Sequence, residues 1–277
     1  MSYYTLEDIL ADILDATKGT KKRNNTNYQL IKEMILKLYL MCSNQEYSID
    51  DKYQFVEVFC KTVIGEIISS DIKIKVNIIE DDNFFNKSNA VMTYNLKDGI
   101  KISSRFISSS KLTINPMLLV NALCHEAGHI EQFLTTKRFI DYIFCDENSN
   151  LSNYEKTLSR VIIAKNLVNI GQSIDGYLEK YDSDIREYDA NMVRNVLFDK
   201  IYENTFMTDK PNSTIKKDMV NIMYSNHFQY YDEGKIDYNT RLLLKKAQQF
   251  SFDNYGIFNN AIEECQITQN QIQLGER

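Results

Sequence analysis

The chain is predicted to be an α+β protein that is predominantly helical, and three features of its sequence predict this. Its 277 residues include only 9 glycines and 2 prolines, where average usage gives roughly 19 and roughly 14. A chain with so few turn residues is unlike an all-β sandwich or barrel. Apolar residues recur at helical spacing over most of its length, while a segment that begins at Asp71 alternates with the period of two typical of strands.

Helical patterns flank this central segment, which divides the chain into three regions. Residues 1–70 form a helical N-terminal region, 71–205 a core that holds the small sheet, and 206–277 a helical C-terminal region that packs on the core. Apolar stripes predict N-terminal helices over residues 6–14, 30–39 and 55–67. Further helices are expected at about 152–170, 183–204, 213–227 and 238–250.

Three short strands are predicted in the central region. Apolar and polar residues alternate from Ile72 to Val76, which predicts the first strand, and Val91–Leu96 forms the second. The turn sequence at 97–99 joins it to a third strand, Ile100–Ile107. We therefore expect a small, mostly antiparallel sheet that precedes a largely apolar helix.

Charge and cysteine content exclude several classes of partner. The net charge is −6 and is spread along the chain, without the clustered Lys and Arg that contact nucleic-acid phosphates. No run of about 18 apolar residues predicts a membrane span, and no secretion signal is evident. Five scattered cysteines without a CxxC pair indicate reduced thiols. These features predict a cytoplasmic protein with no nucleic-acid or membrane partner.

One motif in the apolar helix has the spacing of a metal site. His125 and His129 are four residues apart, so both imidazoles lie on one helix face and can bind a single Zn²⁺. Glu126 follows the first histidine and can take a proton from the bound water. Because only three histidines occur in the whole chain, a chance HExxH match is improbable. Zinc is therefore the expected cofactor, and Glu126 the expected catalytic residue.

A tetrahedral catalytic zinc needs a third protein ligand. A predicted helix offers Glu187 and Asn191, which are four residues apart, so a carboxylate ligand would have a polar partner one turn on. Asp189 faces another direction and is the weaker candidate. Cys145 is a further, isolated candidate.

These two segments resemble the gluzincin metallopeptidases. The family pattern HExxH, followed by ExxA(D/N), is matched by His125–His129 and by Glu187–Asn191. The pattern is closest to that of the HtpX-type membrane proteases and of the soluble ImmA/IrrE-like proteases. The resemblance covers about residues 72–205 and implies a zincin-like core around the HExxH helix.

The resemblance also implies a role for each motif residue. His125, His129 and Glu187 would bind zinc, Glu126 would be the general base and acid, and Asn191 would orient a ligand. In this family, the strand before the metal-binding helix offers its edge to an extended peptide. By this resemblance, the third predicted strand would bind substrate by β-addition.

A zinc peptidase also needs a donor for the developing oxyanion, which His or Tyr commonly provides. His227 lies in an aromatic-rich segment, Tyr224–Tyr231, so His227 or one of these tyrosines is the candidate donor.

The leading hypothesis is a zinc-dependent metallopeptidase that hydrolyses peptide bonds of a protein or peptide substrate by Glu-assisted attack of zinc-bound water. One alternative is a zincin-fold regulatory or binding protein with a metal site but little hydrolysis. Another is a zinc amidohydrolase that acts on other amide bonds. Glu126 favours an enzyme, because a pure binding site has no use for a base at that position.

Overall fold

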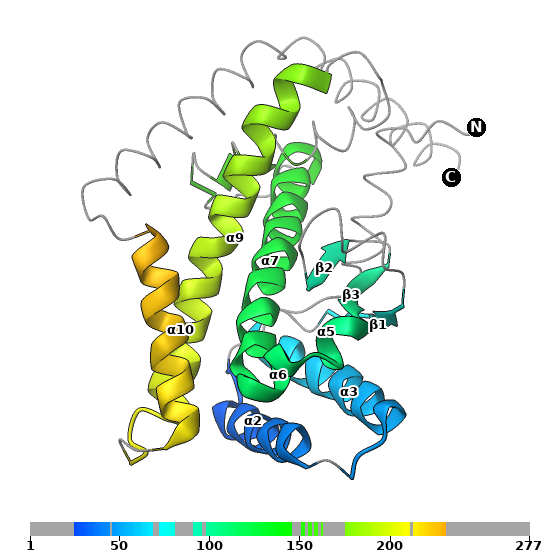
Figure 1. Ribbon diagram of the computed structural model, residues 1–277. Helices are drawn as coiled ribbons and strands as arrows, with labels where there is room; N and C mark the ends of the chain where they lie inside the picture. Colours follow the sequence, from blue (N-terminus) through cyan, green and yellow to red (C-terminus); the bar gives the residue numbers. More distant parts are fainter. Residues whose placement is uncertain are drawn as a thin grey trace, which may run out of the picture. The chain divides into compact units, whose positions relative to one another are not determined.

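A computed structural model gives the fold of the chain (Figure 1). The chain divides into two compact units: unit 1 comprises 1–18, 132–188 and 233–277, and unit 2 comprises 19–131 and 189–232. The structure describes residues 25–44, 46–68, 72–80, 91–95, 98–145, 151–152, 155–156, 158–159, 162, 175–210 and 213–230, with side chains except at 140–145, 175–188 and 227–230. The expected helices at 6–14 and 238–250 lie outside these residues.

The other two expected N-terminal helices are confirmed as α2 (Tyr28–Ser43) and α3 (Ile49–Ile67). Each begins at a capping residue. The Asn27 side chain accepts a hydrogen bond from the amide of Leu30, and Ser48 forms a capping box with Asp51. The apolar stripes face inward, and the fully buried members include Ile31, Ile35, Leu38, Val56, Phe59 and Val63.

The sheet has three strands, β1 (Val76–Ile79), β2 (Met92–Asn95) and β3 (Gly99–Ser103), in the order β1-β3-β2. β2 and β3 are antiparallel, whereas β1 and β3 are parallel, so the sheet is mixed rather than mostly antiparallel. Gly99, the first residue of β3, has φ 78°, a left-handed conformation that glycine adopts without strain. β3 lies between β2 and β1, and residues 80–98 between β1 and β3 are enough for the crossover connection that a parallel pair requires.

The third predicted strand is shorter than the alternation indicated. β3 ends at Ser103, and Ser104–Ile107 forms the short helix α5. The reason is local: the Ser103 side chain accepts a hydrogen bond from the Phe106 amide and so caps a helix. Because β3 has a strand on each side, the expectation that Ile100–Ile107 offers an edge to a peptide is wrong.

In the part of the chain that the structure describes, three long helices follow the short helix α6 (Ser110–Ile114). The side chain of Asn115 accepts a hydrogen bond from the Met117 amide at 3.1 Å, at the start of the first of them. They are α7 (Met117–Cys145), α9 (Asp175–Thr205) and α10 (Thr214–Tyr230). Nothing among the described helices is both long and apolar enough to cross a membrane. The mainly helical α+β class is confirmed.

Within unit 2, a lysine of α2 binds the C-terminal end of α9. The Lys32 ammonium donates to the carbonyl of Thr205 at 2.7 Å and to Asp209 at 2.8 Å. It also lies over the ring of Phe206, 4.9 Å from the centroid. A cation at a helix C-terminus satisfies carbonyls that have no partner within the helix.

A second contact of α2 holds α10. The Tyr39 hydroxyl donates to the carboxylate of Asp218 at 2.7 Å. Burial, and then this hydrogen bond to a negatively charged group, raises the pKa of Tyr39 above its usual value. The phenol therefore keeps its proton and remains a donor. Together the two contacts fix α9 and α10 within unit 2, where α7 also begins.

Candidate functional site

The HExxH motif lies on α7, as the sequence predicts. The ring centroids of His125 and His129 are 4.9 Å apart, and the two ring planes are nearly perpendicular. Both histidines are partly exposed, whereas Glu126 exposes only 4% of its surface and Ala127 none. The motif thus places two adjacent imidazoles at the surface of unit 2 and one carboxyl group in its interior.

α7 and α9 approach each other very closely at Gly128. A Cβ atom on Gly128 would lie 2.7 Å from Cα and 2.9 Å from the carbonyl oxygen of Ala190. Ala190 is fully buried. Since real Cβ atoms do not come this close to backbone atoms, only glycine fits here. This contact brings Ala190 of α9 against the HExxH segment of α7.

A hydrogen bond next to this crossing joins the two motifs directly. Nδ1 of His125 lies 3.1 Å from Oδ1 of Asn191, 66 positions further along the chain. An amide oxygen can only accept a hydrogen bond, so this contact is a hydrogen bond in the tautomer that has its proton on Nδ1 of His125. The lone pair of this imidazole is then on Nε2, which is the atom left to bind a metal ion. The structure thus places Asn191 where it can orient His125.

The other candidate residues are the third ligand, Glu187 or its alternatives, and the oxyanion donor, His227; the structure describes them less completely. Glu187 is on α9, but its side chain lies outside the described residues, as do those of His227 on α10 and Cys145 on α7. Asp189 is partly exposed. No group of three His, Cys, Asp or Glu side chains able to hold a metal occurs in the described part of the chain. The third ligand therefore stays a prediction.

The cysteine next to the motif is not available for chemistry. Burial raises the pKa of the Cys124 thiol well above its usual range; the nearby Arg194 guanidinium opposes this shift, and Asp199 adds to it. Because the thiolate is the nucleophile and the metal ligand, Cys124 stays an inert, packed residue.

Sequence reasoning missed one polar pair near the site. Asn226 of α10 donates from Nδ2 to Oδ1 of Asn121, at 2.9 Å and across 105 positions. Asn121 lies four residues before His125, so the two share a face of α7. The one signal in the sequence was an asparagine one helical turn before the first histidine.

No family model, curated protein or solved structure matches this chain. Its chemistry must therefore be inferred from the residues and their geometry.

Proposed function

We propose that the chain is a zinc-dependent metallopeptidase that hydrolyses peptide bonds of a protein or peptide substrate. The observation that carries the proposal is the 3.1 Å hydrogen bond between Nδ1 of His125 and Oδ1 of Asn191. Metal-binding histidines almost always donate their second ring nitrogen to a carboxylate, a carbonyl or water, which fixes the tautomer and the ring orientation. The Asn191 amide oxygen has the same acceptor chemistry.

The available donors have the chemistry that zinc prefers. His125 and His129 would hold the ion through imidazole nitrogens, and Glu187 would supply a carboxylate. Glu187 precedes Asn191 by one helical turn on α9. Two histidines and a carboxylate, with one open position, form a ligand set of catalytic zinc sites. When bound, zinc lowers the pKa of a water molecule and polarises the carbonyl to be cleaved.

Glu126 is the residue of this chain that moves protons. Its carboxylate would take a proton from the attacking water and then give it to the leaving amine. Burial of Glu126 at 4% exposure supports this role, because a carboxyl group shielded from water interacts more strongly with charges in the site. We propose His227 as the donor to the oxyanion. His227 directly follows Asn226, whose side chain contacts α7.

Metal content and hydrolysis test this proposal together. Wild-type protein should contain one zinc per chain and cleave fluorogenic casein. His125→Ala and His129→Ala should lose the zinc, whereas Glu126→Gln should keep it and lose turnover. Zinc that survives both histidine substitutions would rule out the site. Bound zinc without hydrolysis in the wild type would favour the binding-protein alternative, and cleavage of small amides alone would favour an amidohydrolase.

Chelator competition tests the third ligand. We expect Glu187→Ala to release zinc at a much lower chelator concentration than the wild type, because only two protein ligands remain. Asp189→Ala, in the same helix turn, is the matched control and should retain zinc. If Asp189→Ala released zinc and Glu187→Ala retained it, Asp189 would be the third ligand instead of Glu187. If neither variant differed from the wild type, Cys145→Ser would be the next variant to measure.

A further inference from the structure

An amide pair, formed by the buried Asn226 and the partly exposed Asn121, joins α10 to the helix that carries HExxH. Asn226 exposes 5% of its surface and donates to Asn121 at 2.9 Å. On α10 it continues an inward row of apolar residues, since Met219 and Ile222 expose only 0% and 6%. A polar residue thus occupies a core position where α10 passes α7, one turn before His125.

Amide pairs constrain packing differently from apolar contacts. Apolar side chains can shift along a neighbouring helix at low cost if their volumes still fit. A buried amide donor instead loses its partner when the register changes, and an unsatisfied buried donor is costly. Single polar residues at helix interfaces specify register in this way, at some cost in stability. The position of Asn226 in an apolar row matches this pattern.

We propose that the Asn121–Asn226 pair positions the last turn of α10 for the reaction at His125. This inference rests on the proposed peptidase function. Neither asparagine binds the metal or touches the substrate; the pair fixes the register of α10 along α7. The residues that complete α10, His227–Tyr230, follow Asn226 directly. A change of register would shift the backbone of this whole turn along α7.

Disulfide trapping tests the contact without zinc or activity. We expect Asn121→Cys/Asn226→Cys to cross-link under mild oxidation, as identified by mass spectrometry of the linked peptides. Asn121→Cys/Ser225→Cys is the matched control, because Ser225 is the adjacent, exposed residue of α10; it should not cross-link. Equal cross-linking of both pairs would overturn the register that the proposal requires.

An apolar replacement of the pair tests the positioning role. Asn121→Leu/Asn226→Leu should keep its zinc and its melting temperature, while kcat on fluorogenic casein falls on the order of 10–100-fold, as for other small displacements of reacting groups. Asn121→Asp keeps an acceptor for Asn226 and should retain most of kcat. A structural role alone would instead lower the melting temperature of the double variant and leave kcat unchanged.

The two proposals fail in different ways. A wild-type chain without zinc or hydrolysis overturns the peptidase assignment and, with it, the positioning role. A wild-type chain that binds zinc and cleaves casein, combined with an unaffected double-leucine variant, overturns only the positioning role of the pair.

Discussion

The two halves of α7 use their polar residues in different ways. In the half that belongs to unit 2, polar side chains bond to side chains from distant parts of the sequence. His125 contacts Asn191 of α9, 66 positions away, and Asn121 contacts Asn226 of α10, 105 positions away. Each contact therefore ties α7 to a different helix.

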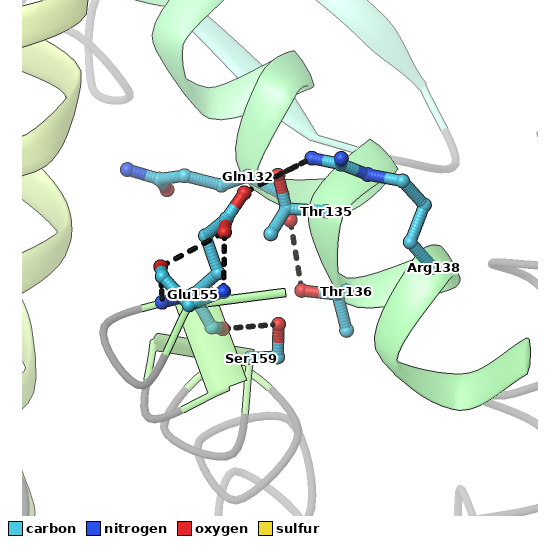
Figure 2. Close-up of polar contacts among 7 residues, drawn as sticks. Gln132, Thr135, Thr136, Arg138, Glu155 and Ser159 are labelled. Atoms are coloured by element: carbon cyan, nitrogen blue, oxygen red, sulfur yellow. Dashed lines mark hydrogen bonds and ion pairs between the residues drawn. The ribbon is translucent and has the colours of Figure 1, made fainter. Parts of the chain in front are cut away.

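In the half that belongs to unit 1, the contacts drawn in Figure 2 join residues that are close in sequence. The Thr136 hydroxyl donates to the carbonyl of Gln132, one turn earlier, at 2.8 Å. Arg138 donates to the hydroxyl of Thr135 at 3.0 Å and to Glu155, 17 positions away, at 3.3 Å. Gln132, Thr135 and Thr136 are nonetheless buried, at 3%, 8% and 0% exposure.

Burial alone therefore does not distinguish a functional polar residue from a structural one. A hydroxyl that bonds the carbonyl one turn earlier is satisfied by its own helix and needs no particular neighbour. A side chain whose partner comes from another helix fixes the geometry between the two helices. We expect substitutions in the first half of α7 to affect chemistry and metal binding, and those in the second half to affect local stability alone.

The largest effect is expected at Glu126. Glu126→Gln should lower kcat by roughly 10²–10⁴-fold, the usual contribution of a general base, with zinc content unchanged. Glu131→Gln, at a partly exposed position five residues later on α7, should behave like the wild type. Comparable losses in the two variants would mean that Glu126 has no specific role.

The next effect is expected at Asn191. Asn191→Ala removes the acceptor of His125 and should weaken zinc binding 10–100-fold, as for other outer partners of metal ligands. Asn191→Asp keeps an acceptor oxygen and should bind zinc at least as tightly as the wild type. Competition with a chromogenic chelator measures both. Unchanged affinity in Asn191→Ala would show that the 3.1 Å contact does not orient a ligand.

A pair of glycine substitutions tests the helix crossing. Gly128→Ala should destabilise the protein by about 1–3 kcal/mol, because its Cβ would overlap the backbone of Ala190. Gly65→Ala in α3 meets nothing within 4 Å and should stabilise it by roughly 0.5–1 kcal/mol through helix propensity. Urea unfolding of the two variants measures this difference. The same sign in both would contradict the close approach of α7 and α9.

The parts of the fold that local patterns determine could be predicted from sequence. The stripes of α2 and α3 depend on periodicity within one helix, and the HExxH spacing depends on one helical turn. The alternation at Ile100–Ile107 was misleading because serine can cap a helix as readily as it can occupy a strand. Strand order depends on pairing between distant segments, so the parallel pairing of β1 and β3 was not predictable.

In the candidate site too, some residues could be predicted from a local pattern and others depend on contacts between distant segments. His125, Glu126 and His129 followed from one short motif. Asn121 and Asn226 did not, because asparagine is mostly an exposed residue and only tertiary packing buries Asn226. The contact of Asn191 with His125 depends on the motif and on the helix crossing at Gly128. A small residue in a sequence does not by itself predict such a crossing.

A smaller effect is expected in the second half of α7. Thr136→Val removes the hydroxyl that donates to the Gln132 carbonyl and should cost about 1 kcal/mol of unfolding free energy or less. Zinc affinity and kcat should not change. A loss of zinc affinity in Thr136→Val would contradict the expectation that the second half of α7 affects local stability alone.

The smallest effect is expected at Glu155, at low pH. Burial tends to raise the pKa of Glu155, but hydrogen bonds from the amide and hydroxyl of Ser152, both at 2.8 Å, and the charge of Arg138 lower it overall. The folded-state pKa thus lies below the ordinary value of 4.5. The stabilisation is therefore complete above pH 4.5 and is lost as the pH falls through the folded-state pKa.

Glu155→Gln tests this dependence without changing the size of the side chain. The difference in unfolding free energy between wild type and variant should be present at neutral pH and shrink below pH 4.5, because the protonated wild-type carboxyl then resembles the amide. Since the Arg138 side chain is 57% exposed, salt should reduce its share of the effect. Thr136→Val, whose contact has no titrating group, should show a constant difference over the same range. A constant difference for Glu155→Gln as well would mean that the carboxylate charge contributes nothing, and that Glu155 acts only as a neutral hydrogen-bond acceptor for Ser152.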